Sequence, residues 1–219
     1  GDCPITPKQG LLSTVGWQIG ERTSYVLEGS VLVCGAVIQW LRDGLGLLKT
    51  AADSEKMALR VKDNGGVYLV PAFVGLGAPY WDPYARGSLH GLTRGTGKDH
   101  VVRAALESMA YQTADVLLAM QEETGLPLRS LCVDGGAAQN GFLLQFQADL
   151  LGIPLLRPAC VETTAFGAAA LAGLAIGFWS GEEELGALRR SERVFRPLRP
   201  QADCDELYRL WRRAVSASQ

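Results

Sequence analysis

The sequence has few of the residues that metal centres and disulfide frameworks require. It contains only two histidines, His90 and His100, in 219 residues. HExxH zinc sites and multi-histidine metal sites are therefore excluded, and we interpret each histidine as a surface or packing residue. The five cysteines are scattered, form no CxxC pair and cannot all pair within the chain. This usage is typical of a reducing compartment, so we expect a cytoplasmic protein.

The chain also lacks an excess of charge and several familiar motifs. It has 21 Lys and Arg against 23 Asp and Glu, a formal net charge of −2. Its overall field therefore does not favour nucleic acid or anionic lipid, and we expect small-molecule chemistry. No GxxxxGK[ST] phosphate loop occurs, and the start of the chain does not have the pattern of a secretory signal.

One uncharged run approaches the length of a membrane span. Residues 163–181 carry no charge for 19 residues, which is close to the length that crosses a bilayer. Alanine and glycine dominate the run and bulky aliphatic residues are few. Small residues allow helices to pack closely inside a protein, so we predict a buried helix and no membrane span.

The composition is that of a folded protein, with 47% hydrophobic and 20% charged residues. We expect residues 1–219 to form a single domain. Because the chain begins with Gly1 and not Met, we expect it to be a piece of a longer protein. Periodicity and turn residues predict strands at 11–17, 23–28, 67–73, 129–133 and 153–157, and helices at 30–44, 53–62, 99–123, 140–151, 163–178 and 203–215. The alternation of strands and helices in the second half indicates an α/β fold with ligands at the carboxyl ends of its strands.

The most informative local feature is the junction between strand 129–133 and the helix that follows it. Asp134, Gly135 and Gly136 end the strand, and Asn140 begins the helix. Adjacent glycines let a ligand lie on the backbone, and the amino terminus of a helix presents free N–H groups. The junction is therefore a candidate nucleotide site. A tight turn without a ligand explains the same residues.

Two further candidates lie on predicted helices. Gly35 interrupts the first helix and Gln39 lies four residues later on the same face, which indicates either close helix packing or close approach of a ligand. Glu162, Thr163 and Thr164 precede the small-residue helix, where capping explains them.

Two charged segments have structural interpretations. Asp82 and Arg86 are expected to brace the long loop 74–97, although they could border a cleft. The five arginines from residue 189 to residue 199 are interpreted as a solvated arm, with an anionic contact as the alternative.

Taken together, the motifs resemble the carboxy-terminal domain of the FGGY family of carbohydrate kinases, over residues 10–215. The segments that carry the resemblance are YVLEGSVLVCGAVIQWLRD (25–43), VPAFVGLGAPYWDPYARG (70–87), GLTRGTGKDHVVRAALESMAYQT (91–113), VDGGAAQNGFLLQFQADLLG (133–152) and ETTAFGAAALAGLAIGFW (162–179). Residues 87–107 look like the second FGGY signature. The loop 75–87 is similar to that of the members that phosphorylate glycerol and unlike that of the pentulose kinases.

The resemblance implies an actin-like, ribonuclease-H-like ATPase domain with a mixed sheet flanked by helices and lacking its first strands. It implies the reaction ATP + glycerol giving ADP + glycerol 3-phosphate, with Mg²⁺. Carried over residue by residue, the adenosine pocket comprises Gly35, Gln39, Gly136 and Asn140, and helix 163–178 packs beneath it.

The resemblance also implies what this chain does not contain. The family's catalytic aspartate, glycerol-binding Arg-Glu pair, tyrosine and phosphate hairpin match no residue here and are expected upstream. We therefore expect no catalytic or metal-binding residue in the chain, contact with glycerol only through the missing portion, and no activity from the chain alone. The complete protein is expected to be a homo-oligomer, and the chain alone to self-associate through an exposed sheet edge.

Two alternatives to this function remain open. One is an actin-fold nucleotide-binding module from a parent without catalytic residues. The other is a kinase of the same family for another polyol or sugar, which the loop 75–87 argues against.

Overall fold

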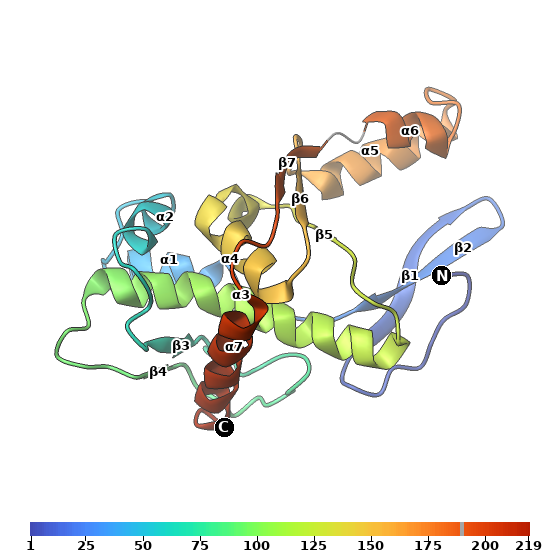
Figure 1. Ribbon diagram of the computed structural model, residues 1–219. Helices are drawn as coiled ribbons and strands as arrows, with labels where there is room; N and C mark the ends of the chain where they lie inside the picture. The colour runs from blue at the N-terminus through green and yellow to red at the C-terminus, as the bar shows by residue number, and fades with distance from the viewer. Residues whose placement is uncertain (189–190) are drawn as a thin grey trace.

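The computed structural model describes residues 1–188 and 191–219 (Figure 1). The α-helices are α1 (Ala36–Asp43), α2 (Asp53–Ala58), α3 (Lys98–Thr124), α4 (Gly141–Leu151), α5 (Thr163–Ala175), α6 (Glu182–Leu188) and α7 (Gln201–Ser216), and a 3₁₀ turn, η1 (Gly136–Gln139), precedes α4. The strands are β1 (Leu12–Ile19), β2 (Arg22–Glu28), β3 (Tyr68–Val70), β4 (Ser88–His90), β5 (Leu131–Cys132), β6 (Leu155–Pro158) and β7 (Ser191–Phe195).

Helix α3 runs through the middle of the molecule (Figure 1). Its first turn is capped by His100, whose Nδ1 accepts the N–H of Gly97 at 3.1 Å, and it ends where Gly125 adopts a φ of 65°. Of its 27 residues, 15 are buried, and they lie on every side of the helix. The sequence predicted one apolar face, whereas the structure surrounds most of the helix with protein.

Several buried polar side chains of α3 bond one another and neighbouring segments. Arg103 Nε donates to Glu107 Oε1 at 2.8 Å, and Asn64 Nδ2 donates to Glu107 Oε2 at 2.9 Å. Arg103 also donates to the carbonyl of Val61 at 2.7 Å. Burial raises the pKa of Glu107, and the Arg103 guanidinium opposes that rise. Helix α2 ends at Ala58, whereas the sequence predicted an end at residue 62. The carbonyl of Val61 binds Arg103 in the segment after the helix.

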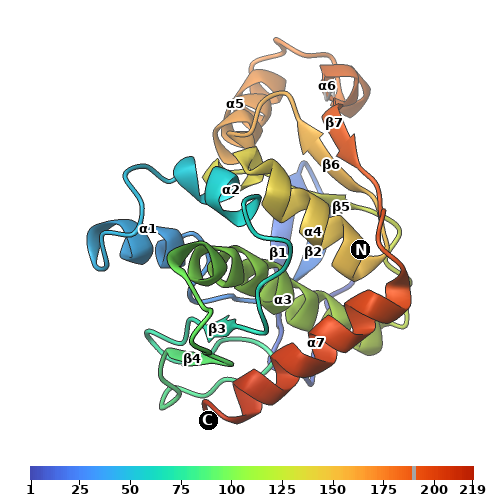
Figure 2. The same ribbon diagram turned by 60° about the vertical axis from the view of Figure 1, so that its left-hand side comes forward.

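Helix α7 closes the core against α3 (Figure 2). The Trp211 ring is fully buried and stacks on Tyr111, with ring centroids 5.2 Å apart. Asp115 accepts hydrogen bonds from Trp211 Nε1 at 2.9 Å and from the Tyr208 hydroxyl at 2.5 Å. Burial raises the pKa of Asp115 to about 6, against the opposing effect of these hydrogen bonds.

The strands form three small sheets. β1 and β2 make an antiparallel hairpin, and β3 pairs antiparallel with β4. The expected mixed sheet has three strands, because β6 pairs parallel with β5 and antiparallel with β7. Leu155 and Phe195 face one another across β6 and β7 and are buried with Ala138, Leu144 and Ala148 in a second core.

The first predicted helix is shorter than expected. Residues 30–35 form no helix. Two of their carbonyls bond other segments, because Ser30 accepts the N–H of Ala78 at 3.0 Å and Val33 accepts Gln112 Nε2 at 3.0 Å. Helix α1 therefore starts at Ala36, with Gly35 at its amino-terminal boundary.

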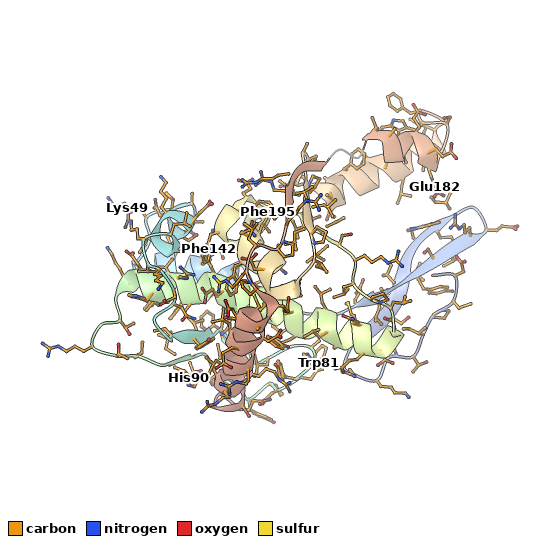
Figure 3. The ribbon with its side chains drawn as sticks, in the orientation of Figure 1. Lys49, Trp81, His90, Phe142, Glu182 and Phe195 are labelled. Carbon is orange, nitrogen blue, oxygen red and sulfur yellow. The ribbon has the colours of Figure 1, made fainter. Side chains whose placement is uncertain are left out.

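The prediction that helix 163–178 is buried is wrong for the described chain. Only Ala170 and Gly173 of α5 are buried, while Phe166 and Leu171 are exposed. Helices α5 and α6 project from the body above the β1–β2 hairpin, as Figure 1 shows, and Glu182 of α6 lies 3.9 Å from Arg22 of the hairpin (Figure 3). Small side chains permit close packing, but the described residues supply no surface that covers this helix. In the described residues, we find no helix with the length and apolarity needed to cross a bilayer.

The arginine-rich segment is also not a free arm. Residues 191–195 form β7, in which Phe195 is 2% exposed and the Arg193 guanidinium lies 4.5 Å from its ring centroid. The many arginines of this segment indicated a solvated segment, although Phe195 within it is buried. The strand forms because its backbone pairs with β6. The arginines at 189 and 190 lie outside the described residues.

Asp82 and Arg86 brace the long loop, as predicted, but through the backbone. Asp82 Oδ1 accepts the N–H groups of Tyr84 and Ala85, and Arg86 donates to the carbonyls of Pro83 and Ala85. Trp81, labelled in Figure 3, fastens the loop to the start of the chain by donating to the Gly10 carbonyl at 2.6 Å. Residues 88–90, within the loop, form β4, which the sequence did not predict.

We predict that Trp211→Phe lowers the free energy of unfolding by about 1–3 kcal/mol at pH 7.5, because the buried Asp115 carboxylate loses a donor. Loss of that donor raises the pKa of Asp115 above about 6. The deficit is therefore present above this pKa and shrinks as the pH falls through it. Urea unfolding at pH 5 and pH 7.5 measures the difference, and an equal loss at both values would contradict the assigned role of Asp115.

Candidate functional site

A cavity of about 750 Å³ lies between α1, the start of α2 and the segment that joins β5 to α4. It sits beyond the carboxyl end of β5, where ligands bind in open α/β folds. Its volume is in the range of small-molecule sites. The lining residues are Gly35, Ile38, Gln39, Arg42, Ala51, Ala52, Ser54, Glu55, Leu106, Met109, Asp134, Gly135, Gly136, Ala137, Gln139, Asn140 and Leu143.

The cavity contains all four residues that were assigned to the nucleotide pocket. Gly35 and Gln39 line it from α1, and Gly136 and Asn140 line it from the turn before α4. The two pairs lie about a hundred positions apart in the sequence, so the fold brings them together. Their placement in one cavity is consistent with a shared pocket. Contact of these four residues with a nucleotide stays a prediction.

Gly35 and Gly136 leave open space at the cavity wall. A Cβ built on either residue would meet no other group within 4 Å. A ligand can therefore approach the backbone at both points, which a larger side chain would prevent. Gly135 has a different requirement, because its φ of 77° and ψ of 179° belong to a region that only glycine occupies readily.

Asn140 has a structural role as well as a place in the cavity. Its Oδ1 accepts the N–H of Leu143 at 2.9 Å and so caps α4. Its Nδ2 donates to Ser54 Oγ at 3.2 Å, which joins α4 to α2. The sequence predicted a helix from residue 53 and gave no signal for a contact between Ser54 and Asn140.

The charged groups of the cavity are of both signs. Arg42 makes a two-pronged contact with the neighbouring Asp43, both bonds being 2.7 Å long. This hydrogen bonding raises the pKa of Arg42 and lowers that of Asp43. Glu55 and Asp134 contribute carboxylates, while Ile38, Leu106, Met109 and Leu143 form the apolar part of the lining. The cavity combines an apolar surface with a few polar groups, as small-molecule sites do.

The third candidate segment is separate from this cavity. Glu162 is the residue before α5 but makes no side-chain capping bond, so the capping interpretation is wrong for Glu162. Thr163 lines a second, more apolar cavity of about 360 Å³, to which Asp134 also belongs. Among residues 1–188 and 191–219 no group of three or more His, Cys, Asp or Glu side chains could hold a metal ion.

His90 and His100 have packing roles, as predicted. His90 Nε2 lies 2.8 Å from Ser88 Oγ and 3.1 Å from Ser218 Oγ, which fastens β4 to the end of α7, and Figure 3 labels this residue. His100 caps α3. Neither residue lines the 750 Å³ cavity.

The fold is α/β, and it places a cavity of small-molecule size beyond the end of a parallel strand pair. Residues 2–176 match the family described as the FGGY family of carbohydrate kinases, C-terminal domain. The chain therefore belongs to this family, and the resemblance inferred from its motifs is confirmed.

Curated relatives match over the whole chain. It is 57% identical over 219 residues to a glycerol kinase of Carboxydothermus hydrogenoformans and 55% identical over 219 residues to a glycerol kinase of Petrotoga mobilis. Each alignment covers 100% of this chain and 44% of the relative. The chain thus spans less than half the length of the curated relatives it matches.

Solved structures confirm the actin-like ATPase fold of the FGGY kinases. A crystal structure of Plasmodium falciparum glycerol kinase with ADP superposes with a TM-score of 0.91 at 30% identity, covering 100% of this chain and 44% of that one. A ligand-bound xylulose kinase of Lactobacillus acidophilus superposes with a TM-score of 0.82 at 24% identity, covering 99% of this chain and 44% of that one, and supports the fold alone.

We predict that Asn140→Ala lowers the free energy of unfolding by about 1–2 kcal/mol, because α4 loses its amino-terminal cap. Asn140→Asp keeps an acceptor for the N–H of Leu143 and should lose less than half as much. Urea denaturation followed by circular dichroism compares the two variants. Equal losses would show that the cap contributes little at this position.

Proposed function

We propose that this chain is the adenosine-binding, carboxy-terminal half of an ATP-dependent glycerol kinase. The observation that carries the proposal is the single cavity that gathers Gly35, Gln39, Gly136 and Asn140 from two distant segments. The solved relative from Plasmodium falciparum was crystallised with ADP, and the curated relatives matched over the full chain are named glycerol kinases. We further propose that residues 1–219 form one domain of a two-domain kinase.

The glycines provide the surface for the nucleotide. The open space at Gly35 and Gly136 lets the adenosine lie against the backbone, with the side chains of Ile38, Leu106 and Met109 close to the base. The carboxamides of Gln39 and Asn140 supply polar contacts. Binding of this kind positions ATP but does not activate the glycerol hydroxyl.

Phosphoryl transfer needs a positioned nucleophile, a proton acceptor and a metal-bound phosphate chain. We assign none of these to a residue of this chain, so the catalytic base and the glycerol contacts are proposed to lie in the remaining part of the kinase. Mg²⁺ would neutralise charge on the phosphates when bound. The described residues contain no group of three or more His, Cys, Asp or Glu side chains that could hold it.

We propose that the protein is cytoplasmic. The five cysteines are all free, which fits a reducing cytoplasm. We propose a homo-oligomer for the complete protein, which analytical ultracentrifugation can test independently of the nucleotide site.

We predict that isothermal titration of the 219-residue chain with ADP gives a weak binding heat. Gly136→Trp should weaken binding about tenfold or more, because the indole fills the space beside the backbone. Asn140→Ala should also reduce the heat. Gly186→Trp is the matched control, since Gly186 also has open space around it but lies on α6, outside the cavity. Unchanged heat in both cavity variants would refute the pocket assignment.

We predict that the complete protein encoded by the gene phosphorylates glycerol with a kcat/KM at least tenfold above its values for dihydroxyacetone and xylulose. A spectrophotometric assay of ADP release measures all three. Absence of turnover with every substrate would contradict the kinase assignment in favour of a nucleotide-binding module. Preference for xylulose would contradict glycerol as the substrate and indicate a kinase of the same family that acts on a sugar.

A further inference from the structure

A chain of two partly buried hydrogen bonds fixes the orientation of the Asn140 carboxamide. Asn140 Nδ2 donates to Ser54 Oγ at 3.2 Å, and Ser54 Oγ donates its one hydrogen to the carbonyl of Ala51 at 2.6 Å. Ser54 is 1% exposed, so its hydroxyl is shielded from water, while Asn140 is half-buried at the cavity. Because its hydrogen is committed to Ala51, the Ser54 oxygen can only accept from Asn140.

The other end of the carboxamide is constrained independently. Asn140 Oδ1 accepts the N–H of Leu143 at 2.9 Å, and a flipped amide would place its NH₂ group against that donor. The flipped state would also set the carbonyl oxygen against the Ser54 oxygen, which has no hydrogen left to offer. Both ends therefore select the same orientation.

The bonds within the protein leave Asn140 with one free N–H and one free lone pair on Oδ1. A donor beside an acceptor complements the edge of adenine, which presents the N6 amino group next to a ring nitrogen. Guanine presents the O6 and N7 acceptors on the corresponding edge and would leave the Oδ1 lone pair facing another acceptor.

We propose that Ser54 is a positioning residue of the nucleotide site, which holds the Asn140 carboxamide in the orientation that selects an adenine over a guanine base. The inference rests on the proposed function, because it requires a nucleotide in the 750 Å³ cavity that both residues line. Ser54 acts through Asn140. Loss of the Ser54 hydroxyl should therefore reduce the preference for adenine over guanine while leaving the fold largely intact.

The test is the ratio of Kd for GDP to Kd for ADP, measured by isothermal titration on the 219-residue chain. Ser54→Ala should weaken ADP binding about fivefold or more and change GDP binding less than twofold, so that the ratio falls. Ser54→Thr keeps the hydroxyl and should retain most of the ratio, which a loss of packing alone would not explain.

Thr50→Val is the matched control. Thr50 Oγ1 donates to Asp53 at 3.0 Å in the turn before α2, but Thr50 does not line the cavity. This variant loses a hydroxyl hydrogen bond of the same segment and should keep the wild-type ratio. Thermal melting of all variants reports any loss of fold.

The outcomes separate the two proposals. If the wild-type chain binds no ADP, both the nucleotide site and the positioning role of Ser54 are refuted. Wild-type chain that prefers ADP, with Ser54→Ala weakening both nucleotides equally, overturns the positioning role alone. A ratio of Kd for GDP to Kd for ADP that is unchanged in Ser54→Ala also overturns the positioning role.

Discussion

The burial of helix α3 on all sides is the constraint on which the rest of the structure depends. Polar side chains on a helix surrounded by protein are stabilised by hydrogen-bond partners, and several partners of α3 come from separate segments. Arg103 and Glu107 bind the end of α2 and Asn64, Gln112 binds the segment before α1, and Asp115 binds α7. Each bond fixes one neighbouring element, and α1 and α2 in turn frame the cavity.

The sequence predicted the elements whose signals are local. The hairpin, α4 and α3 were close to their observed bounds, because turn glycines and capping residues mark their ends. Elements that depend on distant partners were predicted less well. Residues 30–35 have helical spacing but give their carbonyls to Ala78 and Gln112, and β7 exists because β6 lies beside it. The exposed α5 shows that small-residue composition does not identify the surface that a helix contacts.

The candidate site was predicted in the same uneven way. The glycines at 35 and 136 could be found because glycine is conspicuous inside a predicted helix and after a strand. The resemblance to a kinase family assigned both glycines to one pocket, and the fold places both at one cavity. Ser54 could not be found, since a serine at the start of a helix has a sufficient local explanation. Its contact with Asn140 joins residues 86 positions apart, and only the fold reveals it.

The position of α7 in the chain has a consequence for synthesis on the ribosome. Trp211 covers Tyr111 and Asp115, yet it is made about a hundred residues later, a delay on the order of ten seconds at typical translation rates. Throughout that interval the nascent α3 lacks the indole that covers one face of Tyr111 and donates to Asp115. The newly made protein therefore passes through a stage in which its central helix is open to chaperones.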